Sequence, residues 1–145
     1  MNQVPLNPFF KKVLVIDDSE TDRFVARRLI QKYEFAEEIV VQESARKALE
    51  YIRSLESTPE QLPQFIFLDI RMPEIDGFGF LELYKELPES LKVNCVIMML
   101  STSLDPEDHQ RAESNPYVSK FLNKPLDKEK MEELKQEFSA KKHAA

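Results

Sequence analysis

The sequence predicts an α/β protein, a single doubly wound (βα)5 domain built on a five-stranded parallel sheet. First, five short apolar runs alternate with five amphipathic segments over 145 residues, with no repeat or linker between them. Second, polar residues able to do chemistry directly follow four of these runs: Asp17 and Asp18, Asp69, Ser101, and Lys124. Parallel strands joined by right-handed crossovers end on one edge of the sheet, where such folds bind ligands.

The first strand–helix unit follows a proline-containing segment, residues 1–10, which we expect to be a loosely packed N-terminal tail. The apolar run 13–16 predicts a buried strand. Ser19 is placed to cap the next helix, with Asp22 at capping-box spacing. That helix should run to about Tyr33 and turn one apolar face inward: Val25, Leu29 and Tyr33.

The second unit combines a strand at 38–42 with a helix capped by Ser44. The inner face of this helix is apolar: Ala45, Ala48, Leu49, Ile52 and Leu55. A polar loop at 57–63 then leads to the apolar run 65–68, which predicts a strand buried on both faces and ends at Asp69.

Three further segments complete the alternation. The third helix spans 77–87, with Phe80, Leu81 and Tyr84 as its core side. The fourth unit is a strand at 93–100 and a short polar helix that starts at Asp105-Pro106. The fifth is a strand at 117–122 and a helix capped by Asp127, with Met131, Leu134 and Phe138 inward. We therefore expect a domain over 11–139 and a C-terminal tail over 140–145.

Composition narrows the class of function. The net charge of −6 argues against nucleic-acid binding, which needs a clustered basic surface. No apolar run reaches membrane-spanning length, and residues 1–8 lack the features of a signal peptide. The single cysteine, Cys95, lies in an apolar run and cannot form an internal disulfide. We expect a cytoplasmic protein that binds neither nucleic acid nor membrane.

The acids at the strand ends predict a cation site. If the first and third strands are neighbours, Asp17, Asp18 and Asp69 crowd one crevice, and carboxylates about 4 Å apart repel by roughly 4 kcal/mol at an effective dielectric near 20. Oxygen ligands without nearby His or Cys favour Mg²⁺ over zinc. With Lys124 and the Ser101 hydroxyl beside them, these groups could neutralise a phosphoryl group transferred to Asp69.

The sequence resembles a response-regulator receiver domain of two-component signalling, of the stand-alone, CheY-like type. The resemblance covers about residues 12–139 and rests on four motifs in order: Asp17-Asp18, the stretch 69–77, Ser101, and Lys124-Pro125. It implies a flavodoxin/CheY-like fold and a phosphorelay switch that is a phosphoprotein rather than an enzyme, apart from assisting its own phosphorylation and dephosphorylation.

The resemblance also implies roles for individual residues. Asp69 would be the phosphoacceptor, and Mg²⁺ would bind Asp18, Asp69 and the backbone carbonyl of Arg71 directly, and Asp17 through water. Lys124 would contact Asp69 and then the phosphoryl group, across a cis peptide bond to Pro125. The switch residues would be the Ser101 hydroxyl and the Phe121 ring.

Three positions depart from the usual pattern. Arg71 stands where similar domains often carry a small or amide side chain, so its guanidinium could stabilise a phosphoryl group, pair with Asp69 or block a donor. Thr102 is bulkier than the usual residue and could narrow the route to Asp69. Phe121 lacks the hydroxyl of the commoner tyrosine. Arg71 and Thr102 are therefore candidates for tuning turnover.

The expected partners are a sensor histidine kinase or a histidine phosphotransfer protein, and an unidentified downstream protein. Because the sequence ends soon after the fifth helix, we expect output through protein contacts, and weak homodimerisation stays open. One alternative is a pseudo-receiver, an interaction module that is never phosphorylated. Another is a haloacid-dehalogenase-like phosphatase, which would need a second acid two residues after Asp69, where Arg71 stands.

Overall fold

The computed structural model describes residues 9–143, the last five of them by their backbone alone. Five strands alternate with five helices: β1 (Phe10–Ile16), α1 (Glu20–Lys32), β2 (Ala36–Gln42), α2 (Ala45–Ser54), β3 (Phe65–Asp69), α3 (Gly77–Lys85), β4 (Val96–Ser101), α4 (Pro106–Ser114), β5 (Val118–Asn123) and α5 (Lys128–His143). Two short 3₁₀ turns, η1 (Pro59–Gln61) and η2 (Glu89–Leu91), lie in the loops before β3 and β4.

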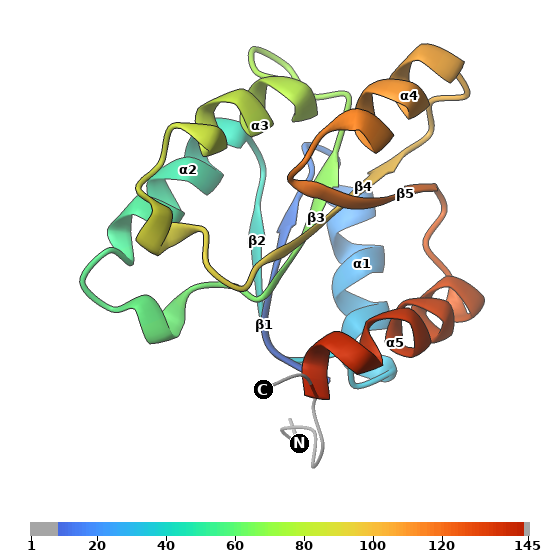
Figure 1. Ribbon diagram of the computed structural model, residues 1–145. Helices are drawn as coiled ribbons and strands as arrows, with labels where there is room; N and C mark the ends of the chain where they lie inside the picture. Colours follow the sequence, from blue (N-terminus) through green and yellow to red (C-terminus); the bar gives the residue numbers. More distant parts are fainter. Residues whose placement is uncertain (1–8, 144–145) are drawn as a thin grey trace.

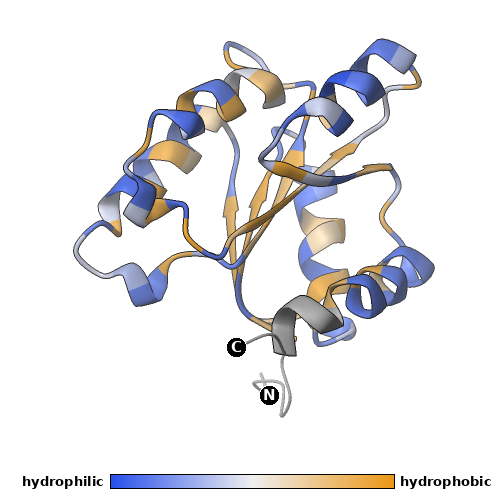
Figure 2. Cartoon of the chain, in the orientation of Figure 1, coloured by the Kyte–Doolittle hydropathy of each residue, from blue (hydrophilic) through white to orange (hydrophobic). Residues whose placement is uncertain are grey.

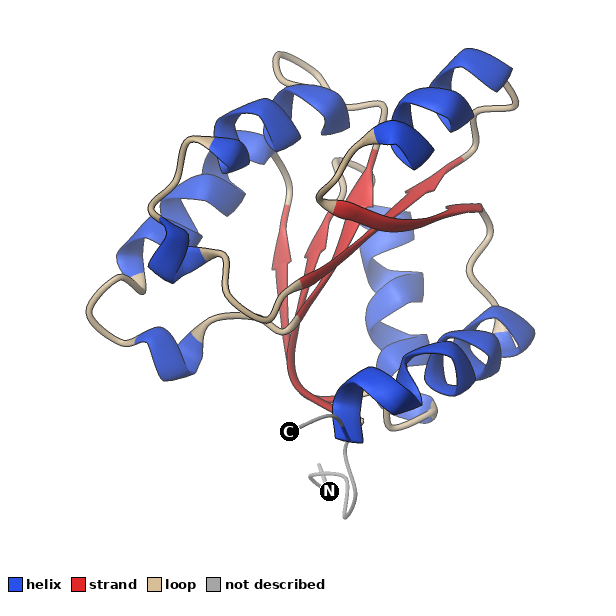
Figure 3. Cartoon of the chain, in the orientation of Figure 1, coloured by secondary structure: helices blue, strands red, loops and turns tan. Residues whose placement is uncertain are grey.

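The strands form one parallel sheet in the order β2-β1-β3-β4-β5. The chain moves outward from β1 to β2, then crosses back to β3 on the other side of β1. This reversal makes the ends of β1 and β3 the switch point of the sheet, where α/β folds form binding crevices. Helices flank the sheet on both sides (Figures 1 and 3), so the predicted doubly wound fold is confirmed.

Each face of the sheet has its own hydrophobic core. Helices α2 and α3 cover one face, where Ile52, Phe80 and Tyr84 are buried among strand residues. Helices α1 and α5 cover the other, where Phe35, Phe65 and Phe67 pack with ring centroids 4.8 to 5.9 Å apart. Apolar residues concentrate on the strands and on the sheet-facing sides of the helices (Figure 2).

The terminal elements extend beyond their predicted limits. Strand β1 begins at Phe10, three residues early, because this buried side chain packs on Phe35 and its N–H donates to the Phe35 carbonyl at 2.8 Å. Only residues 1–8 of the expected tail lie outside the described residues. At the other end, α5 continues to His143, so most of the tail predicted for 140–145 is helical.

Two local predictions were wrong in part. Leu29 and Tyr33 of α1 pack partly buried against the core as predicted, but Val25 is exposed. The fully buried residues of this helix are Ala26 and Ile30. Strand β4 begins at Val96 rather than Val93, because Val96 is the residue that pairs with Phe65, the first residue of β3. Val93 is exposed in the preceding loop.

Candidate functional site

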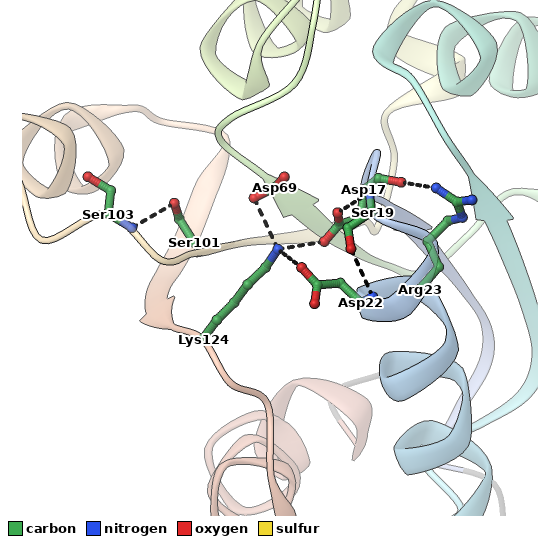
Figure 4. Close-up of polar contacts among 8 residues, drawn as sticks. All are labelled: Asp17, Ser19, Asp22, Arg23, Asp69, Ser101, Ser103 and Lys124. Atoms are coloured by element: carbon green, nitrogen blue, oxygen red, sulfur yellow. Dashed lines mark hydrogen bonds and ion pairs between the residues drawn. The ribbon is translucent and has the colours of Figure 1, made fainter.

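The predicted strand-end residues meet at the carboxyl edge of the sheet. Asp17 and Asp18 follow β1, Asp69 is the last residue of β3, and Ser101 is the last of β4. Lys124 follows β5 and extends across this edge toward the acids (Figure 4). The sheet order therefore brings together residues that are up to 107 positions apart in the sequence.

Asp17, Asp18 and Asp69 form a cluster in which one carboxylate oxygen from each lies within 4.8 Å of the others. The Asp17 and Asp69 side chains are only 6% and 7% exposed, whereas Asp18 is exposed to solvent. These carboxylate oxygens are near enough to one another that a single small divalent cation could be held by the cluster. The all-oxygen donor set fits Mg²⁺ in chemistry as well.

Lys124 contributes the cation of the cluster, with a side chain that is 11% exposed. Its Nζ donates to Asp17 Oδ2 at 2.8 Å and to Asp22 Oδ2 at 2.6 Å, and lies 3.4 Å from Asp69 Oδ1. Burial alone would lower the pKa of Lys124, but the hydrogen bonds to Asp17 and Asp22 outweigh it and hold that pKa above its ordinary value. Lys124 therefore remains charged.

Asp69 responds differently to the same surroundings. Burial raises the pKa of Asp69 to about 7, the negative charge of Asp17 adds to the rise, and Lys124 opposes it. The carboxylate is thus only partly ionised near neutral pH while no further cation is bound. A divalent cation at this edge would favour the ionised form, which is the form with a free electron pair for nucleophilic attack.

Asp22 is a site residue that the sequence reading missed. Ser19 caps α1 as predicted, because its Oγ accepts the Asp22 N–H at 3.2 Å. The Asp22 carboxylate, however, does not return to the Ser19 N–H, which donates to Asp17 Oδ1 at 2.9 Å. It points to Lys124 instead (Figure 4). No local pattern pointed to this contact, because the spacing of Asp22 from Ser19 matched a helix cap and Lys124 is far away in the sequence.

Ser101 is fully buried at the end of β4. Its Oγ accepts the Ser103 N–H at 3.1 Å, and its carbonyl accepts the Lys124 N–H at 2.8 Å. A hydroxyl that accepts one hydrogen bond still has its own hydrogen to donate. Ser101 thus connects the β4–α4 loop to the segment that carries Lys124. The bond between Lys124 and Pro125 is cis, as expected.

Arg71 does not turn toward Asp69. Its Nη2 donates to Asp108 Oδ2 on α4 at 2.6 Å, and the Ser103 hydroxyl donates to the same oxygen at 2.7 Å. Asp108 is buried, while the Arg71 side chain is largely exposed. The guanidinium of Arg71 therefore does not pair with Asp69, which was one of the three roles considered for it.

Phe121 lies on β5, partly buried against the core beneath α4. Its ring packs on His109 of α4 with centroids 4.0 Å apart. His109 Nε2 also lies 3.3 Å from the Ser103 carbonyl oxygen, and this histidine is partly buried. Phe121 is therefore held by a contact with α4, without a hydroxyl.

A cavity of about 260 Å³ opens beside Asp69, between α1 and the segment after β5. Its floor is the sheet, and apolar side chains contribute most of its wall, among them Val25, Phe67, Leu100 and Leu126. Asp22 and Lys124 border its polar end, and the exposed Thr102 also lines it. The phosphoacceptor candidate is thus reached through a partly apolar opening.

Comparisons with known proteins agree on a family. A family model for the response regulator receiver domain matches residues 13–136. The probable methanogenesis regulatory protein FilR2 of Methanothrix harundinacea is 29% identical over 90% of this chain and 83% of its own length. The two-component response regulator ORR1 of Oryza sativa is also 29% identical, and the match covers 86% of this chain but 53% of ORR1.

Solved structures of response regulators are also similar to this chain. A two-component response regulator from Cytophaga hutchinsonii superimposes with a TM-score of 0.82 at 28% identity, over 92% of this chain and 99% of that one. A response regulator receiver protein from Dyadobacter fermentans gives a TM-score of 0.76 at 30% identity, over 90% and 96%. Among the described residues, no helix is both long and apolar enough to span a membrane.

Proposed function

The chain belongs to the response regulator receiver domain family of two-component signalling, and from that premise we propose that Asp69 is its phosphoacceptor. Receiver domains are signalling switches and generally not enzymes. The observation that carries the proposal is the convergence of three acids and Lys124 at the switch point of the sheet. These residues come from the ends of three different strands, so only the folded sheet brings them together.

In the proposed reaction, an Asp69 carboxylate oxygen attacks the phosphorus of a phosphohistidine on a histidine kinase or phosphotransfer protein. The phosphorus–nitrogen bond breaks, its electron pair stays on the imidazole, and an acyl phosphate forms. Lys124 is near enough to donate a hydrogen bond to a phosphoryl oxygen, since its Nζ already lies 3.4 Å from Asp69. Catalysis here is positioning and charge neutralisation.

Receiver domains generally bind Mg²⁺ at an acidic pocket, and the acids present fit that ion. We assign direct coordination to Asp18, Asp69 and the main-chain carbonyl of Arg71, and contact through water to Asp17. The bound ion would neutralise charge on Asp69 and on the incoming phosphoryl group.

The output step begins at Ser101. Its free hydroxyl hydrogen can donate to a phosphoryl oxygen, and movement toward that oxygen would pull on the Ser103 N–H and the β4–α4 loop. Phe121 would then turn inward into the space that the loop leaves, and away from His109. The surface of α4, β5 and α5 would change its preference for a downstream protein, as a two-state shift biased by the phosphoryl group.

Arg71 and Thr102 would tune this switch by separate routes. Arg71 acts through α4, because its guanidinium holds Asp108 there rather than facing Asp69. Thr102 acts on access, because it lines the opening beside Asp69. A cytoplasmic location, the identity of the partners and weak homodimerisation remain part of the same proposal.

Intact-mass measurement after incubation with Mg²⁺ and acetyl phosphate tests the proposal. The expected result is an adduct of one phosphoryl group that is labile to base and is lost in Asp69→Asn. Glu74→Gln is the matched control, because it removes an exposed acid from the same loop and should leave the adduct in place. An adduct that persists in Asp69→Asn would overturn the assignment.

The same measurement separates the two rivals. A pseudo-receiver would form no adduct with acetyl phosphate or with a phosphorylated histidine protein. A phosphatase of the haloacid-dehalogenase type would release phosphate continuously without accumulating an adduct. The second rival lacks its general acid, because the position two residues after Asp69 holds Arg71, whose guanidinium pairs with Asp108.

A further inference from the structure

We propose that Asp22 is a positioning residue that holds Lys124 Nζ back from Asp69, so that the Asp69 carboxylate stays available to a divalent cation. This inference rests on the proposed function, because it concerns how the same site is loaded before phosphorylation. It gives a role to a side chain on α1 that contacts neither the predicted metal ligand Asp18 nor Asp69 in any described interaction.

The distances around Lys124 Nζ favour Asp22. An ammonium group has three hydrogens, and three carboxylates surround Lys124 Nζ, at 2.6 Å for Asp22, 2.8 Å for Asp17 and 3.4 Å for Asp69. The shortest contact is with Asp22, and the longest is with the proposed phosphoacceptor. Lys124 Nζ therefore lies closer to Asp22 of α1 than to Asp69 (Figure 4).

Lys124 and a divalent cation would compete for the same carboxylate oxygens. A divalent cation must be coordinated by the carboxylates of the acid cluster, and Lys124 already occupies an oxygen of Asp17 and lies near one of Asp69. Without Asp22, the ammonium would have only these two acids to satisfy and would compete more strongly with the cation. Removal of Asp22 also removes a negative charge from the neighbourhood of the cation. Both effects weaken cation binding.

Asp22 is also less buried than the other two acids that surround Lys124. The Asp22 side chain is 40% exposed, whereas Asp17 and Asp69 are almost enclosed. Asp22 therefore keeps part of its hydration and can hold Lys124 without the cost of full desolvation.

The simpler role for Asp22 is local, since an acid in the first turn of a helix stabilises the helix N-terminus. The sequence contains a control for that role, because Glu20 is also an acid in the first turn of α1 and is exposed. Glu20→Gln and Asp22→Asn each remove one negative charge from this turn. Only the second removes a contact with Lys124.

The test is calorimetric titration of the full chain with Mg²⁺. Asp22→Asn should weaken Mg²⁺ binding roughly five- to tenfold, which corresponds to about one lost charge contact, whereas Glu20→Gln should change it less than twofold. Asp22→Glu keeps the charge and should recover most of the affinity. Equal losses in Asp22→Asn and Glu20→Gln would overturn the inference, as would unchanged affinity in Asp22→Asn.

A second readout follows Lys124 itself. In Lys124→Gln, the further change Asp22→Asn should cost clearly less Mg²⁺ affinity than it does in the parent protein, because no ammonium remains to be positioned and only the loss of one negative charge is left. A full five- to tenfold loss in that background would show that Asp22 acts by charge alone and would overturn the positioning role. Absence of a phosphoryl adduct in the unaltered protein would instead count against the proposed function.

Discussion

Two cation–carboxylate groups lie along the same edge of the sheet, and they are built in opposite ways. Lys124 is enclosed by Asp17, Asp22 and Asp69, with its side chain 11% exposed. The Arg71 side chain is 62% exposed and ends on a single buried acid, Asp108. In the first group the cation is buried and shared, whereas in the second the acid is buried and the cation lies at the surface.

This difference shows that distance along the chain does not decide which acid a basic side chain pairs with. Arg71 is two residues from Asp69 but turns to α4, while Lys124 is far from Asp69 in sequence and lies 3.4 Å from it. The sheet order positions Lys124 over the switch point, whereas the β3–α3 loop directs Arg71 outward. We therefore expect the Lys124 group to govern chemistry and the Arg71 group to govern the placement of α4.

The largest expected effect comes from removal of the shared cation. Lys124→Met should destabilise the metal-free protein by about 3 kcal/mol, because two enclosed carboxylates lose their partner. Urea unfolding at neutral pH with a chelator measures this. Lys120→Met is the control, since Lys120 pairs with Glu137 nearer the surface and should cost less than about 1 kcal/mol. If both substitutions lowered the free energy of unfolding equally, the buried Lys124 group would contribute no more to stability than the surface pair of Lys120 and Glu137.

The next effect concerns Asp69 and pH. Because the native pKa of Asp69 is raised to about 7, the native state keeps a proton that the unfolded chain releases near pH 4. The stability contributed by this carboxyl is therefore lost as pH rises from about 4 to 7. Asp69→Asn has no carboxyl to ionise in this buried position, so it should be more stable than the parent protein at pH 8 when a chelator is present. We expect a difference of about 2 kcal/mol, less than the full pKa shift of Asp69 would give, because the acids of the cluster titrate together.

Urea unfolding at a series of pH values gives the gap between the two proteins. It should widen from pH 4 to pH 7 and then level off. Saturating Mg²⁺ should narrow it, because the ion binds only the native state of the parent protein with full affinity. A gap that does not vary with pH would mean that Asp69 is not the group with the raised pKa.

A smaller effect is expected at the other group. Arg71→Gln should destabilise the protein by about 1 kcal/mol, because buried Asp108 keeps only the hydrogen bond from Ser103. Arg46→Gln breaks an exposed pair with Glu74 and should cost less than about 0.5 kcal/mol. Thermal unfolding of both variants measures the difference. If Arg71→Gln instead changed the labelling rate of Asp69 and not stability, the two groups would not be separate in function.

The smallest effect is kinetic. Thr102→Ala should speed phosphoryl labelling of Asp69 about twofold, because it widens the opening beside Asp69 without touching either charged group. Stability should be unchanged, since Thr102 is exposed. Thr21→Ala, an exposed change on α1, is the control for the time course of intact mass. Slower or unchanged labelling in Thr102→Ala would mean that Thr102 does not limit access to Asp69.

The fold could be predicted because buried parallel strands appear in the sequence as uninterrupted apolar runs, such as 65–68. The meeting of Asp17, Asp69 and Lys124 followed from that, since parallel topology sends strand ends to one edge. The role of Asp22 could not be predicted, because its spacing from Ser19 matched a local cap and the competing partner, Lys124, is supplied by tertiary structure.

The same limit explains the other errors. The inward face of α1 includes Ala26 and Ile30, which a pattern centred on Val25, Leu29 and Tyr33 does not reveal. The direction of Arg71 depends on where α4 places Asp108, which is a property of the whole fold. Local sequence patterns predicted the helices and strands, whereas contacts between them determine which partner each of these side chains binds.

The packing of Phe121 on His109 gives this protein an internal spectroscopic reporter. The chain contains two histidines and no tryptophan, so its imidazole proton signals are few. The His109 ring, with its centroid 4.0 Å from that of Phe121, lies within the ring-current field of the phenyl group. A turn of Phe121 during phosphorylation would displace one imidazole resonance. The state of the domain could then be followed in solution without a label.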